Sequence, residues 1–439
     1  MHFSTSSLLL YLFASASCTA ASPLYMQRSQ RTPLRTSTRK PSAFTNPTTQ
    51  RVTTPHVLEL TKINNKGNAR SAVELNSQVR TGSTNLVSLA ERGGLATSIT
   101  IGDQTFEVVI DTGSSDLWVV RDDFTCISPD SGWEVEQSDC QFGKAYSPDS
   151  TFDEIDGEYL DIKYADGEIL SGIIGTENVT LAGISVNQTI GLVDYAGWYG
   201  DGVTSGLMGL AYSSLANAYT TDYMQPSLYN PIFATMYEQD LIDPVFSMVM
   251  SRNASSGTAA GYLALGGLPP IDIKGNFSST PILITDIRGY PRTYDFYTVN
   301  IDGVSVGDES FPDADGDSQY LVDSGTTMNY YPDFIADAVN AAFIPPAEYN
   351  DDEGAYVVDC NAKAPVHGVT IGGSTFYINS TDMILPAGTD DSGNETCISG
   401  INAGGNVGQG IFVLGGTFLR NVVAVFDVGA AEMRFAASA

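Results

Sequence analysis

Basic residues are scarce in this chain of 439 residues, which has 21 Lys and Arg against 51 Asp and Glu and a formal net charge of −30. A surface this acidic repels phosphates, so we expect no general binding of nucleic acid or of anionic membranes. Histidine and cysteine are also rare, with three and five copies, and no CxxC motif or Cys/His cluster occurs. We therefore expect no metal site and no cofactor.

Long apolar runs are missing too, apart from one at the extreme N-terminus. Residues 7–18 read SLLLYLFASASC, which matches the apolar core of a secretory signal peptide and is too short to cross a bilayer. The alternative is a buried N-terminal strand. We expect a signal peptide over 1–20. No apolar tail follows Met433, so we also expect no membrane anchor.

What the chain does contain favours a large β-rich body. Apolar residues make up 42% of it, and it has 22 Tyr, 19 Phe and 43 Gly. The charge is polarised: residues 1–80 hold ten basic and two acidic side chains, whereas residues 81–439 hold 11 basic and 49 acidic ones. We expect 21–80 to be a basic propeptide that neutralises the acidic body. A disordered linker is the alternative.

Two further features indicate secretion. Loss of Cys18 with the signal peptide leaves four cysteines, an even number, as two local pairs with one in each half of the body. Six Asn-x-Ser/Thr sequons are typical of a glycoprotein. They are Asn178, Asn187, Asn253, Asn276, Asn379 and Asn394.

The body contains an internal repeat. Residues 106–118 read FEVVIDTGSSDLW and residues 319–331 read QYLVDSGTTMNYY, so each has an apolar run, an Asp, a small hydroxyl residue and a Gly. An apolar-apolar-Gly turn follows each motif, as GLMGL over 206–210 and FVLGG over 412–416. This spacing predicts a duplicated domain with a boundary near residues 270–290.

The coarse secondary structure is mostly strand. Residues 98–110 and 296–306 alternate apolar and polar positions. Two helices are expected, each started by a proline and each with an apolar stripe that packs in the core. The first follows Pro231 with Ile232, Phe233 and Met236, and the second follows Pro332 with Phe334, Ile335, Ala338, Val339, Ala342 and Phe343.

The two Asp motifs predict acid–base chemistry. Each Asp ends an apolar strand, and the Gly turn after it lets the backbone approach closely while hydroxyls and N–H groups hold the carboxylate. If a pseudo-two-fold axis relates the lobes, Asp111 and Asp323 face each other across it. Two such carboxylates share one proton, and one activates a water while the other protonates the substrate carbonyl.

These motifs resemble those of the pepsin-like aspartic proteases, especially the secreted fungal enzymes, over about residues 90–437. NPIFATMYEQDLIDPVFSMVMS (230–251) and VLGGTFLRNVVAVFD (413–427) also resemble family segments. The resemblance implies an all-β dominated, bilobal fold of two pseudo-two-fold related lobes with short helices and a cleft between them. It implies an N-terminal lobe over 81–275 and a C-terminal lobe over 276–439.

The resemblance also implies site roles. Asp111 and Asp323 match the catalytic pair. The supporting residues of the two turns, which hold the carboxylates or tie the loops together, are Thr112, Gly113, Ser114, Ser324, Gly325 and Thr326. KYADGEILSGIIG (163–175) resembles the flap hairpin, and its Tyr164 matches the flap tyrosine that hydrogen-bonds toward Trp118. The remaining substrate-binding candidates are Ala165, Asp166 and Leu207. Asp166 is expected to accept Lys at P1, and the alternative is a surface residue of the hairpin.

The cysteines fit the family as Cys126–Cys140 and Cys360–Cys397 disulfides. Together the sequence predicts a secreted, extracellular acid endopeptidase that is a monomer, is made as a zymogen, cleaves polypeptides and is inhibited by its own propeptide and by pepstatin. Retention in a vacuole is the lesser alternative for its location. Two other functions remain open: a catalytically inactive protease-like binding or inhibitor protein, and a secreted carbohydrate-binding protein.

Overall fold

Most of the described residues lie in strands. The computed structural model describes residues 53–62, 94–129, 131–164, 167–222, 224–251, 260–284, 293–313, 318–351, 354–389, 393–404 and 411–438, all within the unit Pro41–Ala439. The expected signal peptide and most of the basic segment therefore lie outside the described residues. Among the described residues, no helix is long and apolar enough to span a membrane.

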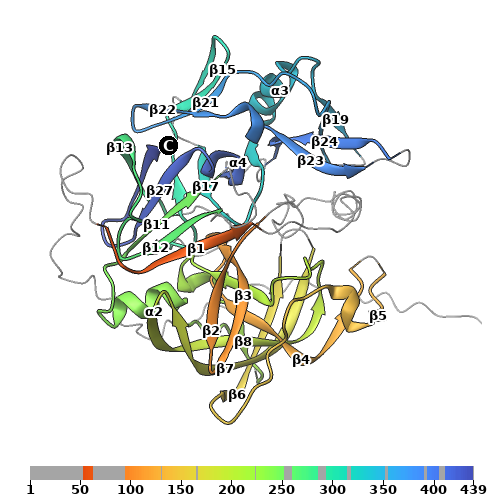
Figure 1. Cartoon of the computed structure of the whole chain (residues 1–439), viewed down its shortest axis with the longest axis vertical. Coiled ribbons are helices and arrows are strands. Elements are labelled where there is room, and N and C mark those ends of the chain that lie inside the picture. Colours follow the sequence, from red (N-terminus) through yellow and green to blue (C-terminus); the bar gives the residue numbers. More distant parts are fainter. Residues whose placement is uncertain are drawn as a thin grey trace, which may run out of the picture. The chain divides into compact units, whose positions relative to one another are not determined.

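The first Asp motif belongs to a 15-stranded sheet. Its first part runs in the order β10-β6-β7-β8-β4-β9-β3-β2, with β5 paired to β4 (Figure 1). These strands are β2 (Leu95–Ile101), β3 (Gln104–Asp111), β4 (Leu117–Ile127), β5 (Glu134–Val135), β6 (Asp153–Lys163), β7 (Ile169–Leu181), β8 (Ile184–Gly197), β9 (Gly206–Gly209) and β10 (Ala218–Thr220).

The same sheet continues through β1-β12-β11-β27-β28-β13. Since β27 and β28 end the chain and pair with β11 and β13, both expected lobes contribute to this part. The strands are β1 (Val57–Lys62), β11 (Val245–Met250), β12 (Gly261–Leu265), β13 (Lys274–Pro281), β27 (Val422–Asp427) and β28 (Glu432–Ala437).

Strand β1 comes from the segment that sequence analysis placed in the propeptide. It pairs antiparallel with β12 along one edge and with β2 at its end, and Figure 1 shows it running between them. Leu60 is 1% exposed and belongs to the core, whereas Lys62 is exposed. Lys62 is the one basic residue of the expected propeptide that lies within the described residues.

The second half holds three smaller sheets. One, in the order β14-β17-β26-β18-β25, carries the second Asp motif. It consists of β14 (Thr298–Val299), β17 (Gln319–Val322), β18 (Asn329–Tyr331), β25 (Ile401–Ala403) and β26 (Ile411–Leu414). The others consist of β15 (Gly303–Val306), β16 (Glu309–Pro312), β21 (His367–Ile371) and β22 (Ser374–Ile378), and of β19 (Glu348–Asn350), β20 (Ala355–Val358), β23 (Ile384–Thr389) and β24 (Glu395–Ser399).

The sequence repeat is a repeat of topology. Strand β3 lies parallel to β9, with Asp111 opposite Gly209, and β17 lies parallel to β26, with Val322 opposite Leu414. In each copy the strand after the Asp motif then pairs antiparallel with the same partner, β4 with β9 and β18 with β26. The internal repeat therefore extends from the sequence to the strand pairing around each Asp motif, and the lobe boundary stays a prediction.

The α-helices within the described residues are short, as expected: α2 (Ile232–Glu238), α3 (Asp333–Ala341) and α4 (Gly416–Leu419). Pro231 and Pro332 lie directly before α2 and α3, so each occupies the cap rather than the first turn. The stripe of α2 is buried as predicted. In α3 the prediction was wrong for Phe334, which is 63% exposed and contacts Phe311, because it lies on the exposed side of the helix with Asp337, whereas Ile335 and Ala336 of the same turn are buried.

Candidate active site

The two Asp motifs place Asp111 and Asp323 at the ends of buried strands. Asp111 is the last residue of β3, and Asp323 directly follows β17. The backbone of each is fixed by its parallel neighbour: Leu210 N donates to Asp111 O at 2.8 Å, and Asp323 N donates to Leu414 O at 3.1 Å. The residues are 7% and 6% exposed, so each carboxyl is nearly buried but retains some access.

Each carboxyl is held by the turn that follows it. Gly113 N donates to Asp111 Oδ1 at 2.7 Å, and the Ser114 hydroxyl donates to Asp111 Oδ2. The second motif repeats this arrangement, with Gly325 N donating to Asp323 Oδ1 at 2.8 Å. Thr326 Oγ1 donates to Asp323 Oδ2 at 2.6 Å. Both side chains therefore have fixed orientations.

The turn glycines bring the two motifs into contact. A Cβ on Gly113 would lie 2.7 Å from Asp323 Oδ1, and a Cβ on Gly325 would lie 2.2 Å from Asp111 Oδ1. Each glycine thus packs directly against the carboxyl of the other motif. Any larger residue there would displace a carboxyl, which explains why the turns carry glycine irrespective of their backbone angles.

Thr112 and Ser324 tie the two turns together by exchanging hydrogen bonds. Ser324 N donates to Thr112 Oγ1 at 2.9 Å, and Thr112 N donates to Ser324 Oγ at 3.1 Å. The hydroxyls then donate across the junction, Thr112 Oγ1 to Val322 O at 2.9 Å and Ser324 Oγ to Ile110 O at 3.1 Å. These four bonds fix the position of one motif against the other.

Burial and proximity raise the pKa of both carboxyls. For Asp111 burial is the main cause, opposed by the hydrogen bonds from Ser114 and Gly113. For Asp323 burial also comes first, and the negative charge of Asp111 raises its pKa further. The pair therefore holds one shared proton more readily than isolated carboxyls do.

The flap residues expected from the sequence lie beside this pair. Trp118 Nε1 donates to the Tyr164 hydroxyl at 2.8 Å, as the resemblance implied. Leu207 is 6% exposed, lies opposite Val109 and Trp118 in adjacent strands, and belongs to the same apolar cluster as Trp118. Ala165 and Asp166, at the hairpin tip, lie outside the described residues.

Sequence reasoning missed two aromatic residues here. Trp198 packs edge-on against Trp118, with ring centroids 5.2 Å apart, and against Tyr164 at 5.7 Å. Phe142 stacks on Trp198 at 6.1 Å and meets Trp118 edge-on. We call Trp118, Phe142, Tyr164 and Trp198 the aromatic cluster. Its members come from four segments, so no local pattern in the sequence marks them as a group.

Asp116, within the first Asp motif, is a buried carboxyl that sequence analysis did not predict to have a role. It is 1% exposed and accepts hydrogen bonds from Asn217 N at 3.0 Å, Asn217 Nδ2 at 2.7 Å and the Tyr229 hydroxyl. Burial raises the pKa of Asp116, opposed by the bonds from Tyr229 and Asn217. The network anchors the motif to the 217–229 region.

The remaining candidates are spread over the surface and the two lobes. Both disulfides are present, Cys126–Cys140 and Cys360–Cys397. Asn178, Asn187, Asn276, Asn379 and Asn394 are exposed, and Asn253 lies outside the described residues. No group of three or more His, Cys, Asp or Glu within the described ranges is arranged to hold a metal ion.

Comparison with known proteins agrees with this geometry. The family Eukaryotic aspartyl protease matches residues 95–438. The chain is 79% identical to a probable aspartic-type endopeptidase of Aspergillus fumigatus over the full length of both. It is 28% identical to penicillopepsin-1 of Penicillium janthinellum over 346 residues, covering 78% of this chain and 94% of that protein.

A solved structure shares the fold. The aspartic proteinase from Irpex lacteus matches with a TM-score of 0.63 at 20% identity, covering 82% of this chain and 96% of that one. The family match over residues 95–438 includes both Asp motifs, and the shared fold is mostly β and pepsin-like. The chain belongs to the eukaryotic aspartyl protease family and is an aspartic-type endopeptidase.

Proposed function

We propose that this endopeptidase hydrolyses peptide bonds with a water molecule activated between Asp111 and Asp323. The observation that carries the proposal is the paired geometry: two nearly buried carboxyls, each held by a glycine N–H and a hydroxyl, each against the glycine of the other motif. Both carboxyls belong to one chain, which supports a monomeric enzyme that acts on polypeptides.

The proposed proton balance starts from a pair that shares one proton, because the pKa of both carboxyls is raised. Asp111 is the ionised member and takes a proton from the water as its oxygen attacks the carbonyl carbon. Asp323, protonated because burial and the charge of Asp111 raise its pKa, gives its proton to the carbonyl oxygen. Collapse of the tetrahedral species returns that proton to Asp323 and passes the proton on Asp111 to the leaving nitrogen.

The test is haemoglobin digestion at about pH 3, where a coupled carboxyl pair retains its shared proton. Wild type is compared with Asp111→Asn, with and without pepstatin. We expect pepstatin-sensitive cleavage by wild type and loss of nearly all activity in Asp111→Asn. A protein that is inactive after removal of its N-terminal segment, or an unimpaired Asp111→Asn variant, would contradict the proposal.

We also propose that the enzyme is secreted, glycosylated and made as a zymogen. Support comes from the apolar run at 7–18, from the opposite charges of residues 1–80 and 81–439, and from the exposure of the described sequon asparagines. Mass spectrometry of secreted protein, before and after glycosidase treatment, checks the N-terminus and the glycans. Intracellular retention, or a secreted chain that still begins at Met1, would contradict this part.

Acceptance of Lys at P1 stays a prediction, because Asp166 lies outside the described residues. A peptide series that varies P1 checks it. Undiminished cleavage after Lys by Asp166→Ala would show the prediction to be wrong.

A further inference from the structure

Glu168 is a buried carboxylate next to the aromatic cluster that the proposed mechanism does not use. It is 2% exposed, although it lies in the flap hairpin rather than in the core. Its backbone closes the hairpin, because Tyr164 N donates to Glu168 O at 2.9 Å. The side chain of Glu168 is therefore fixed relative to the residue whose ring lies on Trp118.

That side chain bonds to a different segment. Tyr199 N donates to Glu168 Oε1 at 3.0 Å. Tyr199 directly follows Trp198, the member of the aromatic cluster that packs against both Trp118 and Tyr164. Glu168 thus connects the two residues that flank Trp118: Tyr164 through the hairpin backbone, and Trp198 through the 198–204 segment.

The pKa of Tyr164 agrees with this proximity. Burial is the first cause that raises it, and the negative charges of Asp111, Asp116 and Glu168 raise it further. Glu168 therefore lies close enough to the phenol to act on it, together with the catalytic candidate.

The 198–204 segment is itself rigidly supported. Gly200 N donates to Cys140 O at 3.0 Å, and Gly202 N donates to Gln141 O at 2.6 Å. A Cβ on Gly200 would lie 2.2 Å from Gln141 O, so the two segments are in direct backbone contact. Asp201 Oδ1 accepts from Val203 N at 2.7 Å and Thr204 N at 2.6 Å, which fixes the turn.

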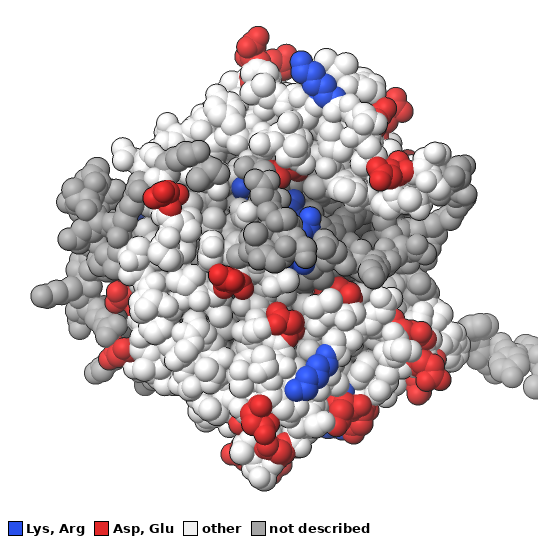
Figure 2. Space-filling model, in the orientation of Figure 1, with Lys and Arg blue, Asp and Glu red and all other residues white. Residues whose placement is uncertain are grey.

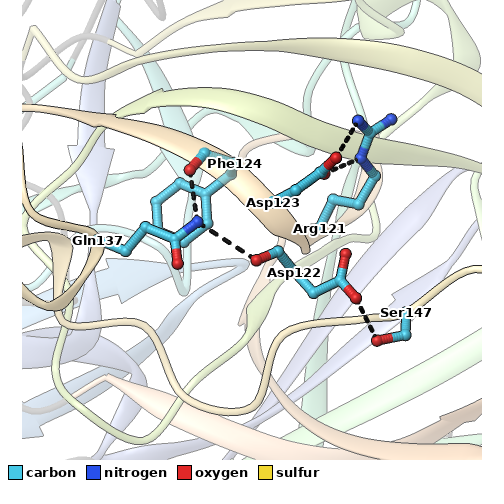
Figure 3. A network of polar contacts seen from close by, with 6 residues as sticks. All are labelled: Arg121, Asp122, Asp123, Phe124, Gln137 and Ser147. Atoms are coloured by element: carbon cyan, nitrogen blue, oxygen red, sulfur yellow. Dashed lines mark hydrogen bonds and ion pairs between the residues drawn. The ribbon is translucent and has the colours of Figure 1, made fainter.

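The support continues to β4 through the first disulfide. Cys140 ends the short helix η2 (Gln137–Cys140) and is bonded to Cys126 in β4. Gln137 Nε2 donates to Phe124 O at 2.6 Å and to Asp122 O at 3.3 Å, where β4 is irregular (Figure 3). In the same view Arg121 pairs with Asp123, and Ser147 bonds to Asp122.

We propose that Glu168 is a positioning residue of the protease. Its carboxylate oxygen accepts the Tyr199 N–H and thereby holds Tyr164 and Trp198 together over Trp118. This contact fixes the substrate-facing ring of Tyr164. This inference rests on the proposed function, since it assumes that Tyr164 contacts substrate. Glu168 acts through Tyr164 and takes no part in proton transfer.

The test compares two variants of equal side-chain length. Glu168→Gln keeps an oxygen that accepts Tyr199 N–H, whereas Glu168→Met removes the acceptor and keeps the apolar packing. For a peptide substrate we expect kcat/KM to fall on the order of tenfold in Glu168→Met, mostly through KM, and to stay within about twofold of wild type in Glu168→Gln.

Glu177→Met is the matched control. Glu177 is also 2% exposed and lies on β7, but it accepts hydrogen bonds from Tyr146, Thr151 and Asn178, away from the aromatic cluster. Glu177→Met also removes a buried hydrogen-bond acceptor. We therefore expect this variant to show a fall in melting temperature comparable to that of Glu168→Met, with an unchanged KM. Equal KM values in the two Met variants, or a Gln variant as impaired as Glu168→Met, would overturn the inference.

Fluorescence provides a second readout that does not depend on activity. Trp133 is 76% exposed, whereas Trp118 and Trp198 are 0% and 3% exposed, so Trp133→Phe leaves only the clustered tryptophans. In that background we expect a red shift of emission for Glu168→Met and none for Glu177→Met. An inactive wild type would contradict the proposed function alone, and an unshifted Glu168→Met spectrum would contradict the role of Glu168 alone.

Discussion

Gly325 shows at the residue scale how tightly the two motifs fit. An alanine there would place Cβ 2.2 Å from Asp111 Oδ1, and that carboxyl is held by Gly113 and Ser114. We expect Gly325→Ala to lower kcat/KM by more than about 100-fold, because the displaced carboxyl loses its alignment with the water.

Gly416→Ala is the control for this variant. Its Cβ would lie 3.4 Å from the nearest atom, Thr327 O, which is an ordinary contact. Activity assays of the two alanine variants at matched concentration of folded protein check the prediction. Similar activities would show that the contact between Gly325 and Asp111 does not matter for catalysis.

Residues in the repeated motifs were predictable because their signal is local and occurs twice. Asp111 and Asp323, with their glycines and hydroxyls, could be assigned from short stretches of sequence. Glu168 and Trp198 could not, because their roles arise from contacts between the flap, the 198–204 segment and β4. The exposure of Phe334 was missed for a related reason: helical periodicity locates an apolar face but does not show how wide a strip of that face the core covers.

At the scale of elements, a buried hydrogen-bond chain connects β18, β21 and β15. Asn329 Nδ2 donates to the Tyr331 hydroxyl at 3.0 Å, which bonds His367 Nε2 at 3.1 Å, and His367 Nδ1 bonds Ser305 O at 2.9 Å. A carbonyl only accepts, so Nδ1 carries the proton and Nε2 accepts from Tyr331. Asn329 Oδ1 also accepts Gly415 N at 3.0 Å, beside the second Asp motif.

Protonation of His367 would break this chain. Burial lowers the pKa of His367 to about 4 from 6.5, against the opposing effect of the Ser305 bond. As the pH falls, His367 is protonated in the unfolded chain before it is protonated in the folded one. The stability that neutral His367 contributes is therefore full above pH 6.5, and about 3 kcal/mol of it is lost as the pH falls to 4.

We therefore expect His367→Gln, which can still accept from Tyr331 and donate to Ser305, to lose less stability on acidification than wild type. The measurement is the melting temperature of both proteins between about pH 7 and pH 4. We expect the two curves to converge near neutrality and to separate below it. Parallel curves would show that His367 is not the titrating group.

Sequence patterns predicted some of the strands but not all of them. Alternation located β2, β3 and β15, and the apolar-apolar-Gly turns located β9 and β26. The sequence did not show that Val57–Lys62 is a core strand, since its pairing with β12 joins residues about 200 positions apart. Local patterns do not encode such pairings.

At the scale of the whole molecule, the acidic charge has few cationic partners. Figure 2 shows Asp and Glu scattered over the visible face with few Lys or Arg among them. Hydrogen bonds lower the pKa of Asp123 and Asp149, both exposed, whereas burial raises the pKa of Asp111, Asp116, Asp194, Asp295 and Asp323.

These shifts predict a protein that is more stable in acid. A carboxyl with a raised pKa binds more protons when folded, so its contribution falls as the pH rises above 3.8. Repulsion among 49 acidic residues in 81–439 acts in the same direction, and His367 acts against both. We expect a higher melting temperature at about pH 4 than at about pH 7.5. The reverse order in calorimetry would contradict this.

Strand β1 has a consequence for how such a molecule is processed. It fills a place one strand wide between β2 and β12, where Ala260 N donates to Leu60 O and Leu265 N to His56 O. A cut after Arg80 would sever the covalent link to β1 without loosening those bonds. Dissociation of β1 would leave the edges of β2 and β12 without hydrogen-bond partners inside the sheet, and unpaired strand edges bind other extended segments. A severed leader of this kind would persist as a tightly held ligand of the enzyme until another extended segment took its place.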